Sequence, residues 1–141
     1  MAQVVALLLA MILLAIGLVH LYWALGGRRA PAAVIPQVAG RPAFEPSRAS
    51  TTVVAIALFV ASALVAIAGR LLADPFTPPL VRCLTFLLGV GLLARAVGEF
   101  RLVGFFKRER ASRFARLDTI LYSPLCLILG LAALFVAYHD A

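Results

Sequence analysis

Four apolar stretches, each about as long as a membrane-spanning helix, constrain this chain more than any other feature. They cover about residues 4–25, 51–69, 80–98 and 119–138. A helix needs roughly 20 mainly apolar residues to cross the hydrocarbon core of a bilayer. Hydrophobic residues make up 64% of the 141 residues, against about 45–50% in soluble domains. We therefore predict an all-α fold, a four-transmembrane-helix bundle that forms a single membrane domain over residues 1–141.

Two polar connectors separate the predicted spans. Residues 28–50 contain four prolines, which exclude a long helix, so we expect an extended connector. Residues 101–117 interleave basic with apolar side chains, a composition typical of a segment that lies in the membrane interface.

The basic residues predict how the chain is oriented. All of them except Arg70 and Arg82 lie in or beside the two polar connectors. Basic connectors favour the cytoplasm, so we predict a multi-pass protein of the cell inner membrane with both termini on the outer side. The net charge of +7 then indicates contact with anionic lipid headgroups and no nucleic-acid partner.

Several polar side chains should share one membrane depth at the cytoplasmic end of the spans. Ionisable groups at membrane depth usually face the bundle interior and pair with one another. We therefore predict a polar pocket there, although structural pairing without a ligand and unrelated interfacial charges are alternatives. The candidate ligand-binding residues are His20, Trp23, Arg95, Glu99, Arg101, Asp118, Tyr122 and Ser123.

The start of the fourth span has two interpretations. Asp118 can cap the helix directly. Alternatively Ser123 is the N-cap and Pro124 the first helical residue, with residues 118–122 as a separate turn.

The sequence carries no signature of catalysis or of a cofactor. No metal-binding or nucleophile motif occurs in it, so we predict no metal, no cofactor and no catalytic residue, and we lean against an enzyme. Cys83 and Cys126 belong to different depths, which excludes a disulfide. His20 and His139 belong to opposite faces, which excludes a haem between them.

Three phrases bring a family into view. HLYWALGG, RAVGEFRLVGFFKR and FARLDTILYSPLCL resemble small four-span bacterial membrane proteins grouped as domain of unknown function 3995. The resemblance implies a four-helix integral membrane protein and carries no activity.

The leading functional hypothesis is therefore a binding protein for a small polar or anionic ligand or a lipid headgroup. The first alternative is a structural accessory subunit in a membrane complex, or a homo-oligomer. The second is a small transporter or membrane enzyme. Small residues at helix surfaces favour packing with a membrane protein partner, whereas the polar cluster favours a ligand.

Overall fold

The chain is all-helical, and four of its helical segments are long and apolar enough to cross a membrane. The computed structural model describes residues 1–27, 31–72 and 78–139. The spans are α1 (Ala2–Ala24), α3 (Arg48–Ala68), α4 (Pro79–Val97) and the run Arg113–His139. The predicted all-α class with four spans is confirmed.

The first connector has more local structure than an extended coil. Within its described residues, α2 (Pro31–Val34) is followed by β1 (Gln37–Val38) and β2 (Arg41–Pro42), which pair antiparallel. Gly40, with a φ of 77°, makes the left-handed turn between the two strands that glycine accepts without strain.

The fourth helical run begins earlier than either sequence interpretation places it. The Ser112 hydroxyl oxygen accepts the Ala115 N–H at 3.0 Å and caps α5 (Arg113–Leu117). A π-helical turn, η1 (Asp118–Tyr122), and α6 (Ser123–His139) follow without a break. Neither Asp118 nor Ser123 is an N-cap. Proline lacks an N–H and clashes with the carbonyl four residues before it, and the wider π turn ends two residues before Pro124.

The helices α1 and α3 form an antiparallel hairpin through small residues. A Cβ on Gly17 would overlap the ring of Phe59, and one on Gly69 would overlap Ala6. The Ser62 hydroxyl donates to the Ala10 carbonyl at 2.8 Å. Close backbone approach of this kind is how helices associate in lipid.

The helices α4 and α6 form a second hairpin in the same way. A Cβ on Gly89 would lie 3.0 Å from the Gly130 carbonyl oxygen, and one on Gly130 would lie 3.0 Å from that of Gly89. The two backbones therefore approach each other closely at these two glycines.

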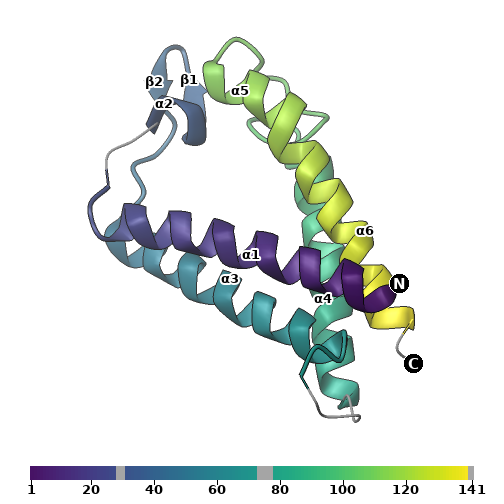
Figure 1. Cartoon of the computed structure of the whole chain (residues 1–141). Helices are drawn as coiled ribbons and strands as arrows, with labels where there is room; N and C mark the ends of the chain where they lie inside the picture. The colour runs from purple at the N-terminus through teal and green to yellow at the C-terminus, as the bar shows by residue number, and fades with distance from the viewer. Residues whose placement is uncertain (28–30, 73–77, 140–141) are drawn as a thin grey trace.

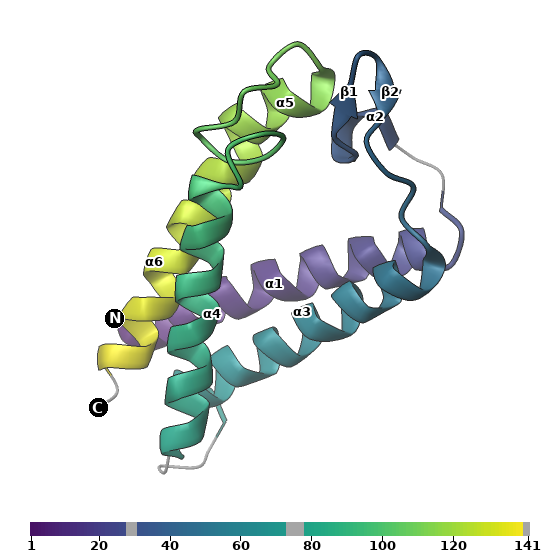
Figure 2. The same ribbon diagram turned by 180° about the vertical axis from the view of Figure 1, so that it is seen from behind.

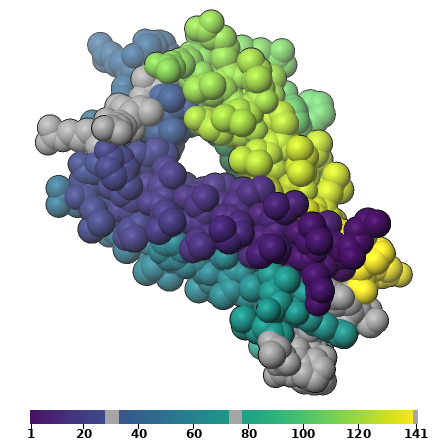
Figure 3. Space-filling model, viewed as in Figure 1, coloured from purple at the N-terminus to yellow at the C-terminus, as the bar shows by residue number. Residues whose placement is uncertain are grey.

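The two hairpins cross near one end and diverge at the other (Figures 1 and 2). Buried apolar side chains fill the crossing, among them Leu9, Leu13, Val65, Leu129 and Val136. At the diverging end, α2 contacts α5 and joins the two hairpins. The space between the hairpins is thereby enclosed and is visible as an opening in Figure 3. The bundle packing is thus not confirmed, because most contacts lie within each hairpin and not between the two.

Both polar connectors lie at the diverging end, whereas the two termini lie near the crossing (Figure 1). The predicted grouping of the connectors at one end of the molecule therefore exists in the structure. Which end lies in the cytoplasm stays a prediction.

Candidate functional site

The chain folds back on itself directly after α4. Gly98 ends the helix at a φ of 88°, and Gly104 has a φ of 90°, a conformation in which other residues are strained. A Cβ on Gly104 would overlap the Val97 carbonyl oxygen. The Phe105 N–H donates to the Ala96 carbonyl at 2.9 Å. These contacts hold the basic segment of residues 101–117, which is the third connector between spans, against the end of α4.

Asp118, the first residue of η1, is fully buried and receives a hydrogen bond from each of four groups. Arg95 Nη2 donates to Oδ1 at 2.8 Å. The Gly104 N–H at 2.8 Å, Lys107 Nζ at 3.0 Å and the Ser123 hydroxyl at 3.2 Å donate to Oδ2. A carboxylate has about four lone-pair sites, and the number of donors equals this, with one on Oδ1 and three on Oδ2.

Lys107 is as fully satisfied as its partner. Its side chain is buried, and Nζ donates to the Gly104 carbonyl at 3.0 Å, to Asp118 Oδ2 at 3.0 Å and to Thr119 Oγ1 at 2.6 Å. An ammonium has three N–H donors, and all three are used. We name this set the Asp118 cluster; its members are Arg95, Gly104, Lys107, Asp118, Thr119 and Ser123.

The π turn is what aligns Asp118 with Ser123. Residues five apart lie about 140° around an α-helix from each other, on different faces. In a π turn, the backbone hydrogen bond joins residue i to residue i+5, so these two residues lie on the same face. The Ser123 hydroxyl therefore reaches the Asp118 carboxylate.

The Asp118 cluster joins α4, the third connector and α6 but leaves little chemistry open. Burying the Lys107–Asp118 ion pair costs desolvation energy. Additional hydrogen bonds to both groups offset this cost, which is the condition under which a buried pair is tolerated. Among the described residues, Arg95 Nη1 is enclosed without a hydrogen-bond partner. The cluster therefore supports the alternative of structural pairing.

Tyr122 connects this end of α6 to the first connector. Its hydroxyl donates to the Ala33 carbonyl in α2 at 3.1 Å, and its ring packs on Phe114 with 5.9 Å between ring centroids. The first connector is thus bonded to the fourth helical run, and α2 also contacts α5.

Glu99 and Arg101 do not join the predicted pocket. The Glu99 carboxylate accepts the Leu102 N–H. The ion pair of Arg95 is with Asp118 and not with Glu99. Arg101 is exposed, and its carbonyl accepts the N–H groups of Arg108 and Glu109. Both residues shape the third connector.

His20 and Trp23 lie on the other hairpin, beside a separate cavity of about 810 Å³. His20 Nδ1 lies 2.9 Å from the Ile16 carbonyl oxygen, and its ring meets Trp23 edge-on with 5.3 Å between ring centroids. We name this space the His20 cavity; it is lined by His20, Trp23, Gly27, Val34, Ile35, Phe44, Pro46, Ser50, Thr51 and Val54. The structure thus divides the predicted pocket into two places.

The residue that sequence reasoning missed is Lys107. It appeared as one more cation in a basic segment, yet it is buried. One signal was available, since it is the only lysine of the chain among arginines. A compact ammonium fits three converging acceptors, whereas a planar guanidinium does not.

Within the ranges described, no group of three or more His, Cys, Asp and Glu side chains could hold a metal ion. Cys83 and Cys126 are both free thiols. At the polar end, the described residues therefore form one tightly paired ion cluster, in which Arg95 Nη1 has no hydrogen-bond partner, and one open cavity.

The comparison with protein families confirms the resemblance noted in the sequence. A family model described as protein of unknown function (DUF3995) matches residues 13–133. The comparisons with curated proteins and with solved structures give no match. The match covers most of the chain, including the second and third spans, both polar connectors and part of the first and fourth spans, and the chain therefore belongs to the DUF3995 family.

Proposed function

We propose that this multi-pass membrane protein binds an anionic amphiphile, with the headgroup and first chain carbons held in the His20 cavity. The observation that carries the proposal is the mixed lining of this cavity at the polar end of the α1–α3 hairpin. The predicted binding of a small anionic ligand or lipid headgroup is thereby moved away from the Asp118 cluster.

The volume and walls of the cavity suit such a ligand. Ligand pockets usually measure about 300–1,000 Å³ and are mostly apolar with a few polar groups, and this one measures about 810 Å³. Val34, Ile35 and Phe44 supply apolar wall, and His20 and Thr51 add polar atoms. This arrangement fits a molecule that is apolar at one end and polar at the other.

The local charge favours an anion. Ser50 and Thr51, in the first turn of α3, line the cavity, so the positive end of the helix dipole lies beside it. The Arg48 guanidinium reaches back to the end of α1, where Nη2 would lie 3.7 Å from a Cβ on Gly26. Glu45 is the one acid of the described connector, and it is exposed and outside the lining.

His20 can bind a headgroup that accepts a hydrogen bond or one that donates it. A carbonyl only accepts, so Nδ1 carries the proton in its bond to Ile16. Nε2 then accepts a hydrogen bond when the ring is neutral and donates one when the ring is charged. A phosphate or a hydroxyl group can therefore bind there.

Trp23 allows a direct test because it is the sole tryptophan and lines the cavity. The purified protein in phosphatidylcholine nanodiscs is titrated with phosphatidylglycerol brominated near the headgroup end of its chains. We expect saturable quenching of Trp23 fluorescence, with much weaker quenching by phosphatidylcholine that carries the same brominated chains.

Two variants on α3 form a matched pair for this titration. Val54→Phe fills the cavity and should reduce the phosphatidylglycerol-specific quenching, whereas Val53→Phe, at an exposed neighbouring position, should leave it unchanged. Equal quenching by both lipids, unaffected by Val54→Phe, would refute the proposal.

A further inference from the structure

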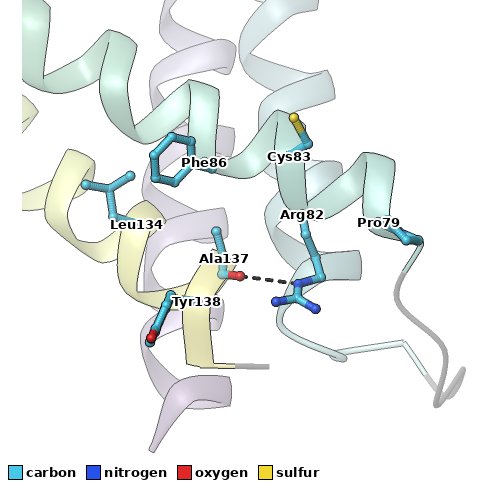
Figure 4. A pocket seen from close by; sticks show the side chains of 7 residues that line it. All are labelled: Pro79, Arg82, Cys83, Phe86, Leu134, Ala137 and Tyr138. Atoms are coloured by element: carbon cyan, nitrogen blue, oxygen red, sulfur yellow. Dashed lines mark hydrogen bonds between the residues drawn. The ribbon is translucent and has the colours of Figure 1, made fainter. Parts of the chain in front are cut away.

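A second cavity, of about 470 Å³, opens between α4 and α6 at the end opposite the polar connectors. We name it the Arg82 groove. Figure 4 shows the Arg82 guanidinium and the Tyr138 hydroxyl at one end of it and the side chains of Phe86 and Leu134 at the other. The groove is therefore polar at one end and apolar along the rest.

Arg82 is only partly satisfied by the protein. Its side chain is half-buried, and Nε donates to the Ala137 carbonyl near the end of α6 at 3.4 Å, a long hydrogen bond. No other hydrogen bond or ion pair joins Arg82 to the described residues. The two amino groups of the guanidinium remain for an acceptor from outside the described chain.

No described acid lies near enough to neutralise Arg82. Those at described positions are Glu45, Glu99, Glu109 and Asp118, which all lie in or beside the polar connectors at the other end of the hairpins. Asp74 and Asp140 lie outside the described residues. A half-buried arginine in a membrane-spanning helix needs an anionic partner or contact with the interface.

The position of Arg82 in the membrane favours a lipid phosphate as its partner. Arg82 lies one turn inside the start of α4 (Pro79–Val97), and Tyr138 lies at the end of α6 (Ser123–His139). These helix ends lie at the interface when the helices span the bilayer, at the depth of lipid phosphates. Phe86 and Leu134 then lie at the depth of the acyl chains.

We propose that the Arg82 groove binds one phospholipid, with the phosphate on the Arg82 guanidinium and one acyl chain along Phe86 and Leu134. Arginine recognises phosphate through two parallel charge-assisted hydrogen bonds, and the Tyr138 hydroxyl can donate a third. This site is independent of the His20 cavity, because it uses the other hairpin and the opposite end of the molecule.

The test uses the full chain in liposomes of phosphatidylcholine that contain a photoactivatable analogue with a diazirine in one acyl chain. After irradiation, mass spectrometry should locate lipid adducts on the stretches that contain Phe86 and Leu134. The loss of a charge-assisted hydrogen bond corresponds to about a tenfold loss in occupancy or more. Arg82→Gln should therefore reduce these adducts by about tenfold.

Two controls separate recognition of the phosphate from general contact with lipid. Arg70→Gln removes the same charge at the same end of the molecule, outside the groove lining, and should keep the adducts. A diazirine-bearing diacylglycerol, which lacks the phosphate, should label the groove weakly in the parent chain.

A third variant guards against a folding defect in Arg82→Gln. Cys83→Trp, at an exposed position in the groove lining, adds bulk to the groove but keeps Arg82, and it should also remove the adducts. Equal labelling of the Arg82→Gln and Arg70→Gln chains, or equal labelling by diacylglycerol, would overturn the proposal.

Discussion

The Asp118 cluster and the His20 cavity lie at the same end of the molecule, yet one is closed and the other is hollow. In the cluster, a buried carboxylate and a buried ammonium use all of their hydrogen-bonding capacity on each other and on neighbouring groups. In the cavity, His20 and Thr51 stand among apolar side chains around about 810 Å³ of space.

The local backbone accounts for this contrast. At α4, Gly98 and Gly104 let the third connector return onto the helix end, which delivers Lys107 to Asp118. After α1, the first connector instead forms α2 (Pro31–Val34) and the short β-hairpin before α3 begins. It therefore does not fold back onto the helix end, and a cavity remains beside His20. Similar polar residues therefore take a structural role in one place and line a cavity in the other.

The largest expected effect follows from removing the carboxylate of the cluster. Asp118→Ala leaves Lys107 and Arg95 without their anion, and breaking a buried pair in this way costs about 3–5 kcal/mol. The free energy of unfolding, measured by sodium dodecyl sulfate titration in mixed micelles, should fall by that amount. Glu45→Gln, at an exposed acid, should change it by less than about 0.5 kcal/mol. Similar values for the two variants would show that the cluster does not stabilise the fold.

Disturbing the fold-back of the third connector should lower the free energy of unfolding by a smaller amount. Gly40→Ala and Gly104→Ala both force alanine into a left-handed conformation, at a cost of about 1–2 kcal/mol. A Cβ on Gly40 meets nothing within 4 Å, whereas one on Gly104 overlaps the backbone of Val97 and Gly98. Gly104→Ala should therefore lose a further amount of about 1–3 kcal/mol in the same titration. Equal losses would mean that the connector is free to move away.

Tyr122 lies between the Asp118 cluster and the wall of the His20 cavity, so its substitution should change both the stability of the fold and the accessibility of Trp23. Tyr122→Phe removes the hydrogen bond to Ala33, at a cost of about 0.5–1.5 kcal/mol. Because Val34 and Ile35 next to Ala33 line the His20 cavity, acrylamide should also quench Trp23 more strongly. Tyr138→Phe, at the opposite end, serves as the control. An unchanged quenching constant in Tyr122→Phe would mean that the cavity wall does not depend on this contact.

The smallest effect on stability is expected in the cavity itself. His20→Leu removes a bond to a backbone carbonyl within the same helix, so stability should change by no more than about 0.5 kcal/mol. Phosphatidylglycerol affinity, from the Trp23 titration, should fall about tenfold, the equivalent of one hydrogen bond. His139→Leu should leave the affinity unchanged. A large loss of stability without loss of affinity would reverse the roles assigned to the two regions.

Sequence reasoning reached part of the site. It grouped Arg95, Asp118 and Ser123, which do meet, because all three lie at helix ends of the same depth. It added His20 and Trp23 for the same reason, although they line a cavity on the other hairpin. It missed Lys107, because a lysine within a basic segment has the pattern of a solvated charge, and the one signal, its being the only lysine among arginines, does not by itself indicate burial.

By itself, the sequence determined how many times the chain can cross a membrane and which residues share a depth. Apolar length and the placement of charge carry that information along one axis, because transfer into hydrocarbon depends on depth. Only the tertiary structure decided lateral position. Close contacts at Gly17, Gly89 and Gly130 pair the helices into two hairpins, and the π turn and the Gly98–Gly104 contact bring Lys107 to Asp118. These are packing choices among equally apolar neighbours, and hydropathy does not distinguish them.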